Sequence, residues 1–377
     1  MRQLADRAVM PHAPTARDGG PAPRPGDTEP APAPAAPLPA EMLVPRGGRI
    51  CLFRALPGIG DLLCAVPAFR AIRTARPDVS VTLVTLPAVA ELAARYEDYL
   101  DEVLPFPGFP GLPDRRPDVP AIPTFLGGMH ERRFDLAIQL HGAGDRTNDV
   151  VRLFGARRSA GFHPRGETAP EPARYLPWVE AEHEIVRWLR LVGHLGIAGD
   201  DTRLELPVAP DADTQGEAVL AEALPPRAGR PLVIVHPGAS AALRRWPARG
   251  FATVVDRLVA EGADIVLTGQ AGERPLTALV RSLVAKPERV ADLAGRTSLD
   301  ELAGILRRAD LLVANDTGVS HVAAALGTPS VVVFVGTDPV RWAPLDTTRH
   351  HAVSGGSARR VADEAARMLR RRRSDAA

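Results

Sequence analysis

An acidic side chain stands at a glycine turn where an expected strand meets an expected helix. Asp61 follows Gly58 and Gly60, after the apolar run 50–54 and before a helical pattern over 61–75. Glycine lets the main chain approach a ligand closely, and a carboxylate held there can act as a general base for a nearby hydroxyl. Asp is also a frequent helix N-cap, so a plain capping role for Asp61 is the competing interpretation.

The same turn does not complete a dinucleotide-binding fingerprint. That motif needs a third glycine at the position of Leu63, and Asp61 occupies the place where a pyrophosphate would rest. A carboxylate would repel the phosphate charge. The turn is therefore predicted to hold an acid at the mouth of a cleft.

A pair of basic side chains in the second half suits an anionic ligand. Arg244 and Arg245 follow the strand candidate 232–235 and a small-residue turn that ends at Ser240. Guanidinium groups supply charge and bidentate donors that fit a diphosphate. Either arginine taken alone is equally compatible with a solvated surface position.

A second strand-to-helix turn in this half is also suited to phosphate. The strand candidate 311–314 runs into residues 316–318, Asp-Thr-Gly, and a helix follows. Main-chain N–H groups and the helix dipole favour an anion there. Thr317 adds a hydroxyl, and His321 is expected to face the same site. The triplet alone also occurs as a cap, but followed by His321 and by Gly-Thr-Asp-Pro at 336–339 it becomes a specific pattern.

Composition sets the broad class of the chain. Its 377 residues favour two globular domains. A hydrophobic fraction of 45% and a charged fraction of 24% exclude a wholly disordered or fibrous protein. The net charge of +1 gives no global attraction to nucleic acid or to an anionic bilayer, so anion binding has to come from a local site.

Two cysteines and the hydropathy pattern bear on the compartment. Cys51 and Cys64 cannot form a disulfide framework or a four-thiolate zinc site, and both lie in apolar runs. They are predicted to be small buried side chains in a reducing compartment. The apolar stretches are too short for a membrane span, and the N-terminus lacks the core of a secretory signal. A soluble cytoplasmic protein is expected.

Short apolar runs alternate with helical patterns from residue 48 onward. This alternation predicts an α/β protein with parallel sheets covered by helices on both faces. Strands are expected at 50–54, 79–84, 134–140, 232–235, 264–267, 289–292, 311–314 and 330–334, and helices at 61–75, 184–195, 251–261, 273–284, 299–308, 319–326 and 357–373.

Proline-rich stretches near 205–230 divide this α/β region into two Rossmann-like domains that would face each other across a cleft. The last helix ends in four arginines, interpreted as a solvated turn that complements the helix dipole, with a nucleic-acid or membrane patch as the alternative. The expected organisation is a disordered Pro/Ala-rich tail at 1–45, domains at 46–206 and 207–350, and a terminal helix within 351–377.

Together these motifs resemble glycosyltransferase family 9, the ADP-heptose:lipopolysaccharide heptosyltransferases. The resemblance covers about residues 48–345, and the motifs that carry it are residues 58–63 with Pro67, Arg-Arg-Trp-Pro at 244–247, residues 316–318 with His321, and residues 336–339. It implies a GT-B fold with the donor held by the second domain and the terminal helix packed back across the first. It also implies an inverting reaction without cofactor or metal.

The resemblance further implies roles for individual residues. Asp61 matches the catalytic aspartate, and Asp145 is a competitor that lacks the strand–glycine–helix setting. Arg244 stands where the family usually has Lys, and His141 where it usually has Gln, so His141 either faces the acceptor or only closes a strand. Donor contacts are expected from Ser240, Arg244, Arg245, Gln270, Glu273, Thr297, Asp316, Thr317, Gly318 and His321, and acceptor contacts from Gly58, Gly60, His141 and Arg146.

The leading hypothesis is transfer of a heptose-like sugar from ADP-heptose or a similar nucleotide-sugar donor to a glycan or lipid-linked acceptor. No nucleic-acid partner is expected, while the oligomeric state and contact with the inner membrane surface stay open. A nucleotide-sugar epimerase with the same fold and a non-catalytic nucleotide-sugar-binding protein are the alternatives. Retention of Asp61 beside an intact 316–318 block argues against the binding protein.

Overall fold

A computed structural model of the chain describes residues 43–225 and 229–375. The expected tail lies outside these residues, except for its last three positions. There Leu43 and Val44 are each only 2% exposed and belong to the first core, and Arg76 donates from Nη1 to the main-chain oxygen of Val44 (2.9 Å). The tail boundary at residue 45 is therefore wrong, because an apolar pair after the proline-rich stretch is anchored in the fold.

The N-terminal half, which runs from β1 to α7, is built on a six-stranded parallel sheet in the order β3-β2-β1-β4-β5-β6. The strands predicted at 50–54, 79–84 and 134–140 are confirmed as β1, β2 and β4. The strands are β1 Arg49–Phe53, β2 Ser80–Thr85, β3 Glu102–Pro105, β4 Leu136–Gln139, β5 Arg158–His163 and β6 Tyr175–Pro177. The α-helices are α2 Ile59–Leu63, α3 Val66–Ala75, α4 Pro87–Ala94, α5 Ile122–Glu131, α6 Thr147–Arg152 and α7 Glu184–His194.

The C-terminal half, which runs from α8 to α14, repeats this architecture with the order β12-β11-β10-β7-β8-β9. All five strands predicted in this half are confirmed. The strands are β7 Leu232–His236, β8 Asp264–Leu267, β9 Val290–Asp292, β10 Leu311–Asn315, β11 Ser330–Phe334 and β12 His350–Ser354. The α-helices are α8 Ala212–Ala223, α9 Ala248–Ala260, α10 Arg274–Leu283, α11 Leu299–Arg308, α12 Gly318–Leu326, α13 Pro339–Trp342 and α14 Ala358–Asp375.

Both sheets have the same strand order when each is numbered from its own first strand, 3-2-1-4-5-6. The order reverses between β1 and β4 in one sheet and between β7 and β10 in the other. Ligands of such sheets bind outside the carboxyl ends of the strands at that reversal. The segments that directly follow these four strands hold Asp61, His141, the pair 244–245 and the triplet 316–318, so the topology collects the sequence motifs at two such points.

The first predicted helix is in fact two helices. The pattern over 61–75 predicted one element, but α2 ends at Leu63 and α3 begins at Val66. Pro67 occupies an N-terminal position of α3, where its missing N–H costs no helical hydrogen bond. Because of the break, α2 is a separate short helix and is not a continuation of α3.

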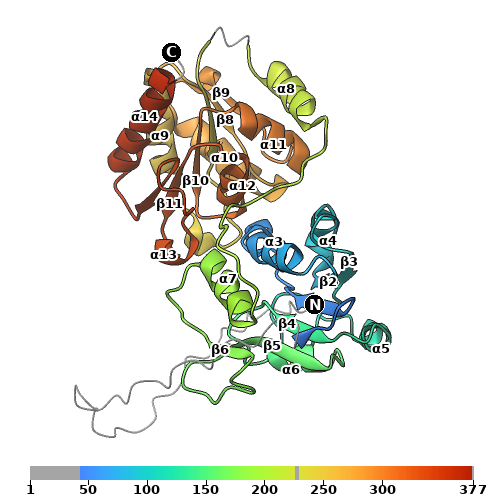
Figure 1. The fold of residues 1–377 in the computed structure, drawn as a ribbon. Coiled ribbons are helices and arrows are strands. Elements are labelled where there is room, and N and C mark those ends of the chain that lie inside the picture. The colour runs from blue at the N-terminus through green and yellow to red at the C-terminus, as the bar shows by residue number, and fades with distance from the viewer. Residues whose placement is uncertain (1–42, 226–228, 376–377) are drawn as a thin grey trace, which may run out of the picture. The chain divides into compact units, whose positions relative to one another are not determined.

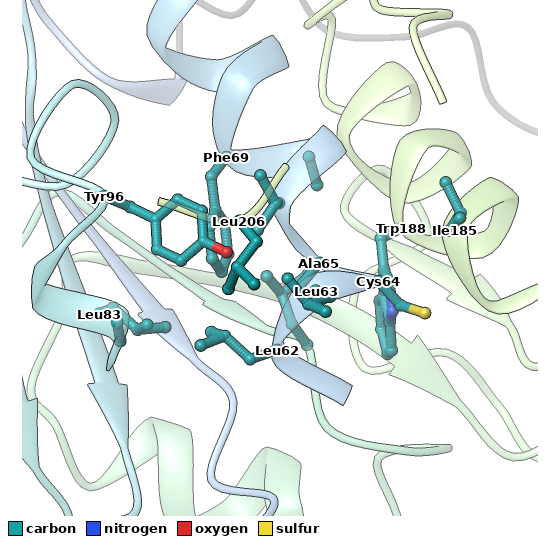
Figure 2. Packing of buried hydrophobic residues seen from close by; sticks show 14 of the residues in the cluster. Leu62, Leu63, Cys64, Ala65, Phe69, Leu83, Tyr96, Ile185, Trp188 and Leu206 are labelled. Atoms are coloured by element: carbon teal, nitrogen blue, oxygen red, sulfur yellow. The ribbon is translucent and has the colours of Figure 1, made fainter. Parts of the chain in front are cut away.

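The apolar side of α2 anchors it in the first core. Leu62 and Leu63 are buried, at 3% and 0% exposure, and Figure 2 shows them next to Cys64 and Ala65. Trp188 of α7, which is fully buried, belongs to the same cluster. Burial of two adjacent leucines of a five-residue helix fixes its rotation, so that the carboxylate just before them points the other way.

The terminal helix belongs to the C-terminal half. Val361, Ala365 and Leu369 of α14 are at most 1% exposed and pack in one core with residues of β7, β10 and α9, and Figure 1 shows α14 beside α9. Arg370 pairs with Glu261 at 2.6 Å. The expectation that this helix packs across the first domain is therefore wrong. The preceding strand β12 extends the second sheet, and a helix that follows an edge strand packs on the sheet of that strand.

Within residues 43–225 and 229–375, no helix combines the length and the apolar character needed to cross a bilayer.

Candidate active site

One large cleft collects the sequence-predicted residues. Its volume is about 1570 Å³, and it is lined by loops from both halves of the chain. This volume exceeds the roughly 300–1,000 Å³ typical of a site for one small ligand. All of the predicted residues line it: Gly58, Gly60, Asp61, His141, Arg146, Ser240, Arg244, Arg245, Gln270, Glu273, Thr297, Asp316, Thr317, Gly318 and His321.

Asp61 presents its carboxylate to the cleft from inside α2. Its side chain is 27% exposed. The N-cap of α2 is Gly58 and no side chain caps that end, so the capping interpretation of Asp61 is wrong. A methyl group on Gly58 would overlap Oδ2 of Asp61, so a larger residue there would displace the carboxylate. Burial raises the pKa of Asp61, while the charges of Arg54 and Arg244 oppose that rise.

A buried arginine holds the turn that carries this carboxylate. Arg54 is 1% exposed. Its Nε donates to the main-chain oxygen of Asp61 at 2.6 Å, and its Nη1 donates to the oxygen of Leu140 at 2.7 Å. The remaining Nη2 lies 3.7 Å from Oδ1 of Asp61 and 3.4 Å from Oε1 of Glu184. The guanidinium therefore ties α2 to the end of β4 and to α7.

Helices α2 and α12 meet at two glycines. A methyl group on Gly60 would lie 2.6 Å from Cδ2 of His321, and one on Gly318 would overlap the Ile59 side chain. His321 is 4% exposed, and its Nδ1 lies 3.7 Å from Sγ of Cys64. These contacts place α2, which carries Asp61, against the turn 316–318 at the start of α12.

His321 is held neutral at this contact. Burial lowers its pKa to about 4, and the neighbouring His183 acts in the same direction. A neutral imidazole adds no positive charge toward an anionic ligand, so the expected donor contact of His321 would rest on shape and hydrogen bonding alone. Cys64 is equally inert, because burial raises the pKa of its thiol.

His141 both closes β4 and faces the cleft. Its Nδ1 accepts from the main-chain N–H of Ala55 at 3.2 Å. That acceptor role places the proton of the neutral ring on Nε2, which donates to Oδ2 of Asp114 at 3.1 Å. The ring stacks on Phe53 with centroids 5.3 Å apart. His141 is only 7% exposed, yet it lines the cavity. It therefore closes the strand and also faces the cleft, whereas contact with an acceptor stays a prediction.

The arginine pair follows a turn that is fixed from β10. Asn315, fully buried, accepts from the Trp246 N–H at 3.0 Å and donates to the Pro237 oxygen at 2.7 Å. Arg245 donates from Nε to the oxygen of Ala239 at 2.9 Å, which closes the same turn. The Arg244 side chain is half-buried, and its charge acts to lower the pKa of both Asp61 and Asp316.

Asp316 serves the architecture of the second turn. It is 3% exposed, and its Oδ2 accepts from the Thr337 hydroxyl at 2.5 Å. Burial raises its pKa. Thr317 is the N-cap of α12, but its side chain makes no capping hydrogen bond. Its hydroxyl is therefore not engaged in capping where Thr317 lines the cleft. Asp316 therefore joins the loops after β10 and β11, and Thr317 and Gly318 form the surface that a ligand can reach.

Glu273 also has an internal partner. Its carboxylate accepts from the Gln270 N–H at 2.8 Å in a capping box, and it lies 3.8 Å from Nε2 of His236. Burial lowers the pKa of His236, and the charge of Glu273 opposes this. Thr297 is half-buried at the same end of the cleft. The expected donor contact of Glu273 stays a prediction, and the capping box already engages one of its carboxylate oxygens.

Four residues were missed from the sequence, three that line the cleft and one, Arg54, that is buried behind Asp61. They are Arg54, Asp114, Glu184 and Arg341. The acid Asp114 is the partner of His141, while Glu184 and Arg341 pair at 3.1 Å across a separation of 157 residues. The Asp-Pro at 338–339 was a signal for the last of them, since Asp338 caps α13 through Val340 N at 2.9 Å and thereby positions Arg341.

Among the described residues, no group of three or more His, Cys, Asp and Glu side chains is arranged to hold a metal ion.

Two parallel six-stranded sheets of equal strand order, with both switch points lining one cleft, define a fold of the GT-B type. The family model "Glycosyltransferase family 9 (heptosyltransferase)" matches residues 128–365, which is more than half of the chain. The chain belongs to this family.

Individual relatives are similar over parts of the sequence or at the level of fold. Lipooligosaccharide heptosyltransferase 2 of Haemophilus influenzae is 31% identical over 121 residues, which is 31% of this chain and 34% of that protein. The alignment thus spans about a third of its length. The glycosyl transferase family 9 structure from Veillonella parvula superposes with a TM-score of 0.69 at 19% identity, covering 86% of this chain and 98% of that one. The E. coli ADP-heptose lps heptosyltransferase II superposes with a TM-score of 0.66 at 20% identity, covering 86% and 99%.

Proposed function

We propose that the protein is an inverting, metal-independent glycosyltransferase that moves a heptose-like sugar from a nucleotide-diphosphate donor, ADP-heptose, to a hydroxyl of a glycan or lipopolysaccharide-type acceptor. The observation that carries the proposal is the placement of one accessible carboxylate, Asp61, in the same cleft as Arg244 and the N-terminus of α12. A proton acceptor and an anion-binding wall in one cavity are the two elements that such a transfer needs.

The chemistry follows from this pairing. Asp61 accepts the proton of the acceptor hydroxyl while that oxygen forms a bond to the anomeric carbon of the donor sugar. The bond from this carbon to the diphosphate oxygen breaks on the opposite face, which inverts the configuration. The leaving diphosphate carries the electron pair, and its charge is met by Arg244, Arg245 and the main-chain N–H groups at Thr317 and Gly318. One carboxylate is sufficient, because no glycosyl-enzyme intermediate is formed.

Family membership supports the choice of sugar and donor. The matched family is described as heptosyltransferase, and a similarly folded E. coli protein is named for ADP-heptose. In the N-terminal half, Gly58, Gly60, His141 and Arg146 lie on the side of the cleft where the acceptor would meet Asp61. With a lipid-linked acceptor the enzyme would work in the cytoplasm at the inner face of the membrane.

The donor is tested by a thermal-shift series with ADP-, GDP-, UDP- and dTDP-sugars. Each stabilising compound is then incubated with de-O-acylated lipopolysaccharide core, and the product is analysed by mass spectrometry and anomeric NMR. We expect ADP-heptose to stabilise the protein most, turnover in the presence of EDTA, and a product of inverted configuration.

Three other outcomes would replace the proposal. Interconversion of a free nucleotide-sugar without acceptor would identify an epimerase. Stabilisation by nucleotide without turnover of any donor would identify a binding protein. Loss of turnover in EDTA that added Mg²⁺ or Mn²⁺ restores would contradict the metal-independent mechanism.

A further inference from the structure

A chain of buried charges leads from the proposed base to α13 of the C-terminal half. Arg54 contacts both Asp61 and Glu184, as described above. Glu184 is 2% exposed, and its second oxygen, Oε2, accepts from Nε of Arg341 at 3.1 Å. Arg187, which is fully buried, also donates to this oxygen. The carboxylate of Glu184 is therefore shared by three guanidinium groups, one of which comes from the other half.

The contact with α13 has several components. Arg341 also donates from Nη1 to Glu180 at 3.1 Å. The ring of His183 hydrogen-bonds through Nε2 to the oxygen of Ala343 at 2.8 Å. The guanidinium of Arg341 lies 4.9 Å from the ring centroid of Trp342, which lines the cleft with it. The start of α7 and the helix α13 thus make a polar joint beside the cleft.

We propose that Arg54 and Glu184 are positioning residues for the carboxylate of Asp61, and that Arg341 connects them to the C-terminal half of the chain. When the contact between α7 and α13 is intact, the negative charge of Glu184 is balanced by Arg341 as well as by Arg54. Arg54 can then orient the turn that carries Asp61. When Arg341 is withdrawn, the negative charge of Glu184 competes with Asp61 for Arg54.

Energetics favour a positioning role over a stabilising one. Replacement of a buried ion network by apolar side chains is often neutral or stabilising, whereas loss of one partner leaves an uncompensated charge. The guanidinium nitrogens of Arg54 and both carboxylate oxygens of Glu184 are directed at named groups on β4, α2, α7 and α13. Such a directed network specifies geometry at the point where the base must be held.

The direction of the electrical effect follows from the groups that face Asp61. These are Arg54 after β1, His141 after β4, Glu184 of α7 and Arg244 before α9. The charges of Arg54 and Arg244 lower the pKa of Asp61, as does His141 when its ring is protonated, and the charge of Glu184 raises it. Removal of Arg341 strengthens the effect of Glu184, so Asp61 should bind its proton more tightly.

The test is a titration of Asp61 by ¹³C NMR in the full-length protein, with its carboxyl signal assigned from the Asp61→Asn difference spectrum. Arg341→Gln is expected to raise the midpoint by about 0.3 pH unit or more, and Arg54→Gln by about 1, because an adjacent opposite charge shifts a pKa by about 1–3. Glu184→Gln should lower it, and Arg341→Lys should restore most of the wild-type value. Arg359→Gln is the matched control, because Arg359 is 92% exposed on α14 and its substitution removes the same charge.

The catalytic consequence rests on the proposed function, whereas the titration does not. With ADP-heptose and de-O-acylated lipopolysaccharide core, the acid limb of kcat/KM should move with the midpoint in each variant. An unmoved midpoint in Arg341→Gln, equal to that of Arg359→Gln, would overturn the proposal even if the enzyme is active. A shifted midpoint in a protein that turns over no donor would support the positioning network but contradict the transferase assignment. If Arg54→Gln fails to fold, Arg341→Gln and Arg341→Lys still decide the question.

Discussion

Gly60 and His321 touch across the two halves of the chain: a methyl group on Gly60 would lie 2.6 Å from Cδ2 of the imidazole. Neither residue is free to change without the other, because the ring is 4% exposed and Cα of Gly318 lies close to the same position. This contact brings the proposed base and the proposed phosphate turn into one cavity.

Gly60→Ala should loosen that contact. The added methyl overpacks a filled interface, which typically costs about 1–3 kcal/mol, so the melting temperature should fall by several degrees and kcat should fall with it. Gly127→Ala is the matched control, because Gly127 lies within α5 with no atom within 4 Å of the added carbon. It should be neutral or slightly stabilising. A Gly60→Ala protein as stable as Gly127→Ala would contradict the close approach of the two helices.

Asp61→Asn should abolish most turnover while nucleotide binding persists. A general base contributes about 10²–10⁴-fold, and the amide cannot accept the proton. Asp145→Asn is the same isosteric change at another cleft-lining carboxylate and should leave kcat within a few-fold of wild type. Steady-state kinetics with isothermal titration of ADP separates the two effects. The reverse ranking of the two variants would transfer the base role to Asp145.

The two adjacent arginines should respond differently to truncation. Arg244→Ala removes a guanidinium that we propose stabilises the charge of the leaving diphosphate, so kcat should fall by about 10²-fold or more. Arg245→Ala removes the hydrogen bond to Ala239, which loosens the turn and should mainly raise the KM of the donor. Arg244→Lys keeps the charge but not the fork, and intermediate rates are expected. Equal losses in both alanine variants would show that the pair acts as one unit.

Stability should decrease as the pH falls from about 6.5 to about 4. Burial lowers the pKa of both His321 and His350 to about 4, below the value of about 6.5 in the unfolded chain. The unfolded state therefore binds more protons than the folded state in this window. As the pH falls through it, the free energy of unfolding decreases by up to about 3 kcal/mol for each histidine. Well above pH ~6.5 neither contributes a slope.

His350→Gln isolates one of these contributions. His350 forms a buried pair with the Ser330 hydroxyl at 2.9 Å, where β12 begins and away from the carboxyl ends that carry the cleft loops, and glutamine can replace that hydrogen bond. Urea unfolding at about pH 7 and about pH 5 should show a smaller difference in the variant than in the wild type. An unchanged difference would mean that His350 is protonated without penalty in the folded protein.

The central strands could be predicted from sequence because both faces of each are covered. Runs such as those of β7 and β11 are buried at every position, so they form continuous apolar segments in the sequence. Two edge strands, β3 and β12, lack this signal, although a third edge strand, β9, was predicted. β3 is half-buried or exposed throughout, and β12 is only partly buried and begins with two histidines. These strands were missed, and the assignment of β12 outside the second domain followed from that.

For a related reason, the sequence could predict which residues line the cleft. Its motifs follow the strands that flank the two switch points, so spacing along the chain reports position in space for residues such as Asp61 and Arg244. Buried charges give no comparable signal. Arg54 and Glu184 lie 130 residues apart in the chain, and a charged side chain in sequence is normally expected at the surface. Only the packed structure shows that they meet.

The anchoring of α14 in the core of the C-terminal half affects the order in which the protein can mature on the ribosome. Leu369 supplies one of the apolar side chains of that core, so the C-terminal half cannot complete its interior until the chain has emerged beyond this residue. One core cluster of the N-terminal half, which includes Phe53, Phe106 and Phe154, comes entirely from segments synthesised much earlier, so it can pack first, and the cleft-lining loops of the C-terminal half join it afterwards.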